Sequence, residues 1–179
     1  MRAGGGKSKG AAYERKVCER LSKWMTRGLR DDLYWRSAMS GGRATVKRKK
    51  GQKNETQLGD ISAIDPLGEP LTRKFFCECK FYADLKLHGM YVQTVASNPM
   101  GGIAAFWEKA VQEATDNNRH PMLIAKQNNF PEIILLSLEG IDLLGLDGND
   151  LWHAVFPQAA GGAVMLYFDT FLKHAKRLR

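Results

Sequence analysis

The alternation of apolar and polar residues predicts an N-terminal helix over residues 9–26. On a helical wheel, its apolar side chains gather on one face and most of its charged side chains on the other. The apolar members are Tyr13, Val17, Cys18, Leu21, Trp24 and Met25. Glu14 falls in the middle of this apolar face. A carboxylate directed at a core needs a cation, a metal or hydrogen-bond donors, so Glu14 is a candidate functional residue.

Further along the chain, two segments have the pattern of strands joined in a hairpin. The first strand is predicted over 59–64, the turn over 65–70 and the second strand over 73–82. One face of the second strand carries Phe75, Cys77, Cys79 and Phe81, and the other carries Phe76, Glu78, Lys80 and Tyr82. Glu78 and Lys80 are therefore expected on the same side of the sheet, about 7 Å apart along the strand.

The remaining pattern completes an α/β domain. A short apolar segment at 33–36 leads into a long polar stretch that ends at residue 57. Beyond the hairpin, the pattern predicts a helix over 103–116, strands over 122–126, 133–138 and 164–168, and a short basic helix over 169–179. The order strand, helix, strand favours a right-handed crossover with parallel pairing. We therefore expect a central mixed sheet flanked by helices, with the candidate site at the edge of the sheet.

The size and composition of the chain fit one globular domain. It has 179 residues, of which 44% are hydrophobic and 26% charged. We expect residues 1–9 to form a disordered basic tail and residues 10–179 a single domain. No apolar run approaches the roughly 20 residues that span a bilayer, and no signal peptide is recognisable, so an intracellular protein that does not bind membranes is expected. The three cysteines, Cys18, Cys77 and Cys79, are expected to be core thiols because an odd count argues against a disulfide framework.

Positive charge is concentrated in the first third of the chain. The net charge is +8, but residues 1–58 carry +11 and the rest carries −3. Such an uneven distribution is typical of a surface that binds a polyanion, although a solvated tail is the alternative. The candidate DNA-binding residues are Arg36, Arg43, Lys47, Arg48, Lys49, Lys50 and Lys53.

The residue types that carry chemistry are Asp60 and, eighteen positions later, Glu78 with Lys80. Two carboxylates on adjacent strands suit Mg²⁺, which prefers hard oxygen ligands and fills its remaining positions with water and phosphate. A lysine on the same face can orient the attacking water or stabilise the transition state. The alternative is a cross-strand salt-bridge cluster without catalytic function.

This order of helix, strands with D…ExK, helix and strand resembles the PD-(D/E)xK nucleases. The finer resemblance is to the archaeal-type Holliday junction resolvases and their phage-borne relatives, and it covers residues 9–127. It is carried by four segments, Lys9-Gly10-Ala11-Ala12-Tyr13-Glu14-Arg15, Arg36-Ser37-Ala38-Met39-Ser40-Gly41-Gly42, Gly59-Asp60-Ile61 and Glu78-Cys79-Lys80. The resemblance implies a restriction-endonuclease-like core.

The resemblance also implies roles for individual residues. Asp60 and Glu78 would bind the metal, with Glu14 as a supporting acid, and Lys80 would be the catalytic lysine. Ser40 would be the loop serine near the scissile phosphate, with Ser37 as its rival because the loop before Asp60 is unusually long and basic. Gly59 replaces the proline of the family name, a change expected to matter little because that proline ligates nothing.

The expected function is that of a Mg²⁺-dependent endodeoxyribonuclease, with Mn²⁺ as a substitute, that cuts branched DNA in recombination or repair. Cutting two strands symmetrically implies a homodimer, and the apolar stretch 133–146 is either part of its interface or core. A phage-encoded protein acting in a host cell fits the resemblance. Two rivals stay open: a nuclease for linear or single-stranded DNA, and a nucleic-acid-binding protein without catalysis.

Overall fold

The computed structural model describes residues 5–37, 59–86, 102–146, 148, 151–156, 159 and 161–178. Its centre is a five-stranded sheet in the order β3-β4-β5-β7-β6. These strands are β3 (Phe75–Tyr82), β4 (His120–Gln127), β5 (Ile133–Leu136), β6 (Ala154–Phe156) and β7 (Ala163–Tyr167). The pair β3 and β4 is parallel, whereas the other pairs are antiparallel. The sheet is therefore mixed, as predicted, and β3 forms one of its edges.

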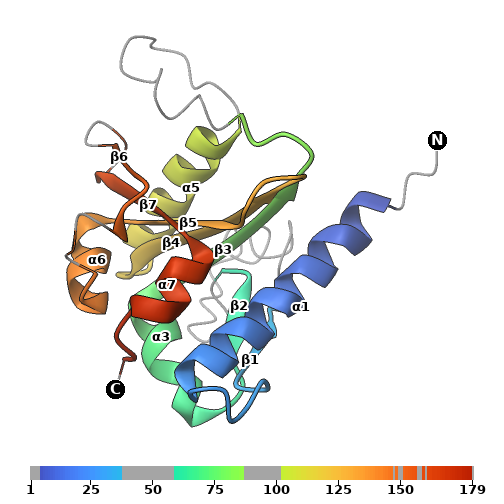
Figure 1. The fold of residues 1–179 in the computed structure, drawn as a ribbon, viewed down its shortest axis with the longest axis vertical. Coiled ribbons are helices and arrows are strands. Elements are labelled where there is room, and N and C mark those ends of the chain that lie inside the picture. The colour runs from blue at the N-terminus through green and yellow to red at the C-terminus, as the bar shows by residue number, and fades with distance from the viewer. Residues whose placement is uncertain are drawn as a thin grey trace.

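Helices cover both faces of the sheet (Figure 1). On one face lie α1 (Gly5–Met25), α6 (Leu138–Leu144) and α7 (Phe168–His174), whose apolar residues join one core cluster. On the other face lies α5 (Ile103–Asp116), which joins a second cluster. The crossover from β3 through α5 to the parallel strand β4 confirms the predicted strand–helix–strand unit.

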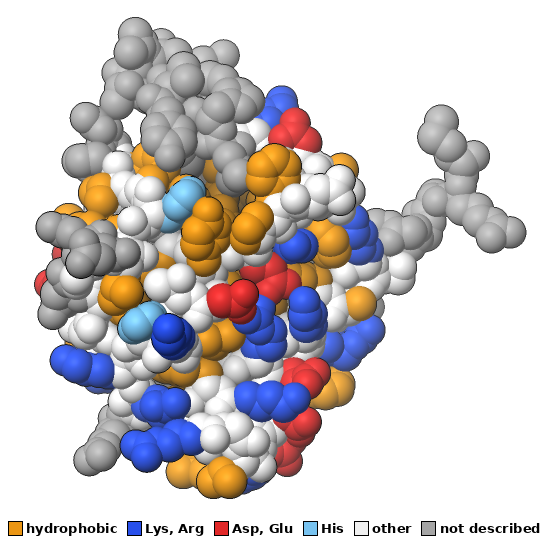
Figure 2. Space-filling model, viewed as in Figure 1, with side chains coloured by type: hydrophobic (Ala, Val, Ile, Leu, Met, Phe, Trp, Pro, Cys, Tyr) orange, Lys and Arg blue, Asp and Glu red, His pale blue; other side chains and the backbone are white. Residues whose placement is uncertain are grey.

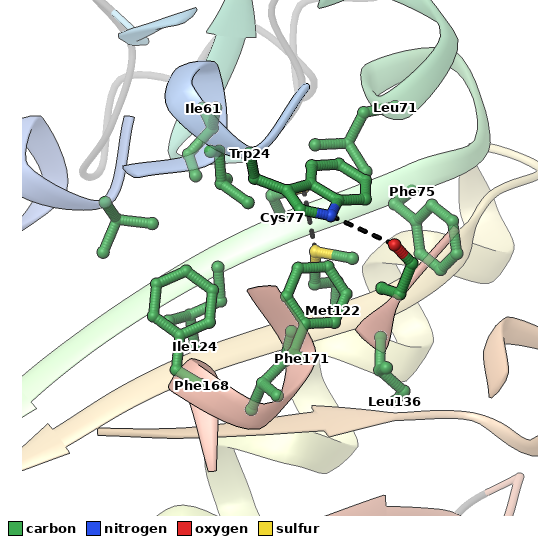
Figure 3. Close-up of a cluster of buried hydrophobic side chains, with 14 of the residues drawn as sticks. Trp24, Ile61, Leu71, Phe75, Cys77, Met122, Ile124, Leu136, Phe168 and Phe171 are labelled. Carbon is green, nitrogen blue, oxygen red and sulfur yellow. Dashed lines mark hydrogen bonds between the residues drawn. The ribbon is translucent and has the colours of Figure 1, made fainter. Parts of the chain in front are cut away.

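The larger core cluster lies between α1, α7 and the sheet (Figure 3). Trp24 of α1 packs against Phe171 of α7 with ring centroids 5.3 Å apart, and its indole nitrogen donates to the carbonyl of Ala175. All three cysteines are buried thiols. Cys77 packs into this core with its sulfur 3.7 Å from that of Met122, which confirms the interpretation as core residues.

A smaller two-stranded sheet lies beside α1. It pairs β1 (Tyr34–Arg36) antiparallel with β2 (Ile61–Ala63). The predicted hairpin between 59–64 and 73–82 is therefore wrong: β2 pairs with β1, and no ladder joins it to β3. The segment predicted as a turn forms a 3₁₀ turn (Pro66–Gly68) followed by α3 (Glu69–Lys74). This short helix forms because it buries Leu71 in the core.

One other prediction needs correction, and the structure favours one of two alternatives that the sequence left open. Helix α1 begins at Gly5, so residues 5–9 belong to a helix and not to a disordered tail. The apolar stretch 133–146 belongs mainly to the core, because Ile134, Ile141 and Leu144 are fully or almost fully buried. Within the described ranges, no helix combines the length and apolar character that crossing a membrane requires.

Candidate active site

Asp60 lies against the edge strand β3, although it is outside any strand ladder. Its backbone N–H donates to the carbonyl of Cys77 over 2.8 Å, and its Oδ2 accepts from the N–H of Cys79 over 2.9 Å. These two hydrogen bonds fix the carboxylate beside the strand that carries Glu78. The predicted proximity of the two acids is therefore correct, but main-chain contacts produce it in place of a hairpin.

Gly59 makes this close approach possible. Its φ is +81°, in the region that favours glycine, and a Cβ built on it would lie 2.5 Å from the carbonyl oxygen of Cys77. Any side chain at this position would push the segment away from β3. Glycine at this position thus lets Asp60 reach the strand, a role that the comparison with the family's proline did not reveal.

Glu78 and Lys80 project from the same face of β3 and form an ion pair. Both are largely buried, and Lys80 Nζ also lies 5.5 Å from the ring centroid of Phe106 on α5. Burial lowers the pKa of Lys80, but the nearby carboxylates of Glu78 and Asp60 outweigh it and raise that pKa above its usual value. Lys80 therefore carries its positive charge at neutral pH.

The burial of two neighbouring acids has a clear electrostatic consequence. Burial, and then the charge of Glu78, raise the pKa of Asp60 to about 7. The ammonium of Lys80 and the N–H of Cys79 act in the opposite direction but do not cancel the rise. When both acids are ionised, the single charge of Lys80 does not balance them, so a further cation would stabilise the ionised pair.

Glu14 occupies the predicted place on α1 and has a cationic partner. Its Oε2 accepts a hydrogen bond from Nε of Arg36 over 2.8 Å. The Glu14 side chain is largely buried, and its charge contributes to the raised pKa of Asp60. The acid on the apolar helix face is thus compensated by Arg36 of β1, a residue that the sequence assigned to DNA binding.

Ser37, one of the two loop-serine candidates, is buried beside Asp60. Its N–H donates to the carbonyl of Asp60 over 2.9 Å, and its hydroxyl lies 2.6 Å from that of Ser62. The structure therefore gives Ser37 a role in joining β1 to the segment that holds Asp60. The rival candidate and most of the predicted DNA contacts lie outside the described residues; they are Ser40, Arg43, Lys47, Arg48, Lys49, Lys50 and Lys53.

The donor set suits Mg²⁺ in its usual protein environment. Among the described residues, no group of three or more Asp, Glu, His or Cys side chains has the arrangement of a metal site. Mg²⁺ does not require such a group, because one or two carboxylates together with water and substrate phosphate commonly hold it. Asp60 and Glu78 supply two such carboxylates side by side.

Sequence reasoning missed two residues next to this site. Tyr82 follows Lys80 on the same face of β3, and its ring stacks on Phe106 with centroids 5.1 Å apart. The alternation along the strand had placed Tyr82 on this face, but its exposure and its partner depend on the position of α5. Phe106 was interpreted only as core, whereas it also contacts the candidate site.

A mixed sheet flanked by helices, with an aspartate and an ExK sequence at its edge strand, defines the core of the PDDEXK nucleases. A family model described as "Phage putative PDDEXK endonuclease" matches residues 5–149. The chain belongs to this family, and its class is therefore that of a nuclease. Comparisons with curated proteins and with solved structures gave no match.

Proposed function

We propose that the protein is a Mg²⁺-dependent endodeoxyribonuclease that hydrolyses phosphodiester bonds at branched DNA. The observation that carries this proposal is the buried pair of acids, Asp60 and Glu78, beside the protonated Lys80 on an edge strand. With both acids ionised, this cluster holds two negative charges against the one positive charge of Lys80, and a bound divalent cation would stabilise that ionised state. The family membership independently favours phosphodiester hydrolysis.

In this proposal, each residue has a defined task. Asp60 and Glu78 would hold the ion, with Asp60 oriented by its hydrogen bond from Cys79. Bound Mg²⁺ would lower the pKa of a coordinated water and neutralise charge on the scissile phosphate. Lys80 would donate hydrogen bonds to the attacking water or to the phosphate oxygens, and its raised pKa keeps it cationic.

Glu14 is proposed as the supporting acid of the same site. In the structure it is paired with Arg36, so a metal-binding role would require this pair to open or to be shared. A phosphate of bound DNA is a competing partner for the guanidinium. Arg36 is thus proposed to serve both Glu14 and DNA.

The branched substrate and the homodimer are supported by the resemblance to junction resolvases. Two symmetric cuts need two active sites related by a twofold axis. The charge of the first 58 residues, +11, supports a polyanionic substrate but does not distinguish its shapes. The experiment described next therefore compares branched DNA with linear and single-stranded DNA.

The experiment uses one end-labelled four-way junction, a linear duplex of the same sequence and its single strand. The wild-type protein is incubated with each in Mg²⁺, in Mn²⁺ and in EDTA. We expect cleavage of the junction with either ion, none in EDTA, and paired cuts in opposing strands. Equal cleavage of all three substrates would favour the general nuclease, and binding without cleavage would favour the non-catalytic protein.

A further inference from the structure

We propose that Tyr82, supported by Phe106, is a stacking platform for an unstacked DNA base beside the scissile phosphate. This inference rests on the proposed nuclease function and specifies which feature of the DNA the site binds. The base is the flat, apolar part of a nucleotide whose phosphate would lie next to Lys80 and the metal-binding carboxylates.

The position of Tyr82 follows from the geometry of β3. Alternate residues of a strand share a face, so Glu78, Lys80 and Tyr82 project in the same direction. The step from Lys80 to Tyr82 is about 7 Å along the strand. This length is similar to the offset between a phosphate and the base of the same nucleotide. Because β3 is an edge strand, DNA can approach this row of side chains without disrupting a ladder.

The ring of Tyr82 packs on Phe106, and about half of the residue stays exposed to solvent. It stacks on Phe106 with an interplanar angle of 30°, while 47% of Tyr82 is exposed to solvent. Phe106 is in turn partly buried against the core cluster that contains Trp107. An exposed tyrosine that is immobilised in this way presents a ready π-surface, and little side-chain freedom remains to be lost when a second ring stacks on it.

The same aromatic pair is continuous with the catalytic lysine. Nζ of Lys80 lies 5.5 Å from the ring centroid of Phe106, so a cation and an aromatic surface lie side by side. A nucleotide has the complementary pair of features, an anionic phosphate and a flat ring. Bases inside a duplex are stacked on each other and cannot use this surface. Branch points and single strands supply unstacked bases.

The test measures binding in EDTA, so that no cleavage occurs. The junction carries 2-aminopurine, a fluorescent base that reports stacking, at positions next to the branch point. The single strand carries it at the same positions in the sequence. Tyr82→Leu and Tyr82→Ala remove the flat ring, and Tyr82→Phe keeps it; leucine also preserves an apolar contact to Phe106. The matched control is Tyr167→Ala, because Tyr167 is also exposed and packs on a ring, His153, but lies on β7.

The expected result is a loss of affinity that depends on the substrate. Tyr82→Leu and Tyr82→Ala should weaken binding of substrates with unstacked bases by roughly 5- to 150-fold, and of the linear duplex by no more than about threefold. The wild type and Tyr82→Phe should change the fluorescence of one 2-aminopurine position, and both other variants should lose that change. Tyr167→Ala should behave as the wild type.

Two results would overturn the proposal that Tyr82 is a stacking platform. Unchanged junction affinity and fluorescence in Tyr82→Leu would show that no base stacks there, and equal losses on all substrates would indicate a general backbone contact. A loss confined to the single strand would support the platform and assign it to unpaired DNA. Since binding is read without metal, failure of the wild type to cut DNA would contradict the nuclease proposal separately.

Discussion

The position of Asp60 depends on the residue before it. Gly59 has a positive φ, and its missing side chain lets the chain contact Cys77 of β3. Gly59→Ala should therefore destabilise the protein by roughly 2 kcal/mol or more, since the backbone conformation alone costs about 1–2 kcal/mol for alanine. Cleavage should fall further than stability explains, because Asp60 would move away from Glu78.

Urea denaturation and single-turnover cleavage of the same preparation measure both effects. Gly10→Ala is the matched control, because Gly10 lies within α1 with no atom near its added Cβ. That change should be neutral or stabilise the helix by about 0.5–1 kcal/mol. A Gly59→Ala protein with normal stability and activity would show that the close approach to β3 is unimportant.

The raised pKa of Asp60 predicts how stability depends on pH. The pKa is about 7 in the folded state and 3.8 for an ordinary aspartate, so folding binds a proton between these values. The stability contributed by this proton is complete below about pH 4 and is lost as pH rises through 7. A bound divalent ion should offset this loss, because it binds the deprotonated carboxylates.

Thermal melts with and without Mg²⁺ or Mn²⁺ at pH 5.5 and pH 8 test this expectation. At ten times the Kd, the ion should raise the Tm by roughly 3–6 °C at pH 8. The increase should be smaller at pH 5.5 and absent in Asp60→Asn, which should itself be more stable than the wild type at pH 8 without metal. The same increase at both pH values would contradict the coupling between ion and Asp60.

At the scale of helices and strands, the periodic elements could be predicted and the irregular ones could not. Strong apolar periodicity predicted the helices at 9–26 and 103–116 and the strand that carries Lys80. Each of these elements is present. Helix α6 was missed although its signals were readable: Ser137 caps its start and Gly145 ends it in a left-handed conformation. Helix α3 was taken for a turn because Pro66 and Gly68 lie just before it and Pro70 lies in its first turn, although it buries Leu71.

In the candidate site, too, some contacts could be predicted from the sequence and others could not. The pairing of Asp60 with Glu78 could be predicted because residue type and spacing indicate a shared metal. The partner of Glu14 could not be predicted, since Arg36 reaches it only after β1 packs beside α1. Likewise, the stacking of Tyr82 depends on where α5 places Phe106.

The ion pair between Glu14 of α1 and Arg36 of β1 allows a test of whether Glu14 serves the active site or only the fold. Glu14→Gln should lower the single-turnover cleavage rate by about 100-fold or more, as expected for removal of charge that acts on the transition state. The loss of stability should be small, about 1 kcal/mol, because Arg36 is one-third exposed and keeps access to water.

Rates and melting temperatures measured on one preparation decide this point. Glu19→Gln is the control on the same helix, because it removes an exposed ion pair with Lys23 and leaves the site untouched. A clear fall in melting temperature with activity retained would identify Glu14 as a structural acid that serves only to hold Arg36.

For the molecule as a whole, the placement of charge decides where DNA is expected to bind. On the face seen in Figure 2, basic side chains along α1 lie next to acidic ones. Lys16 and Arg20 are paired with Glu132, and Arg20 also with Asp169. These two basic residues of α1 are therefore already paired with acids of the folded chain. Arg36 and the basic residues between β1 and β2 in sequence stay the predicted phosphate contacts.

Replacing Lys47, Arg48, Lys49 and Lys50 together by serine should weaken DNA binding and reduce its salt dependence. Each phosphate contact contributes roughly 0.9 to the slope of log affinity against log salt, so the slope should fall by about 2–4. Single-turnover cleavage of bound DNA should change much less than affinity. An unchanged slope would mean that these residues do not contact phosphate.

The most direct test of the central claim is cleavage by proteins that lack one acid of the buried pair. Asp60→Asn and Glu78→Gln are compared with the wild type and with Asp142→Asn, an exposed acid on α6. All four are given the same labelled four-way junction in Mg²⁺, after binding in EDTA shows equal affinity. We predict loss of cleavage by at least about 1,000-fold for both site variants, as expected when a metal ligand is removed, and wild-type rates for the control. Near-normal cleavage by either Asp60→Asn or Glu78→Gln would contradict the assignment of this pair as the catalytic centre.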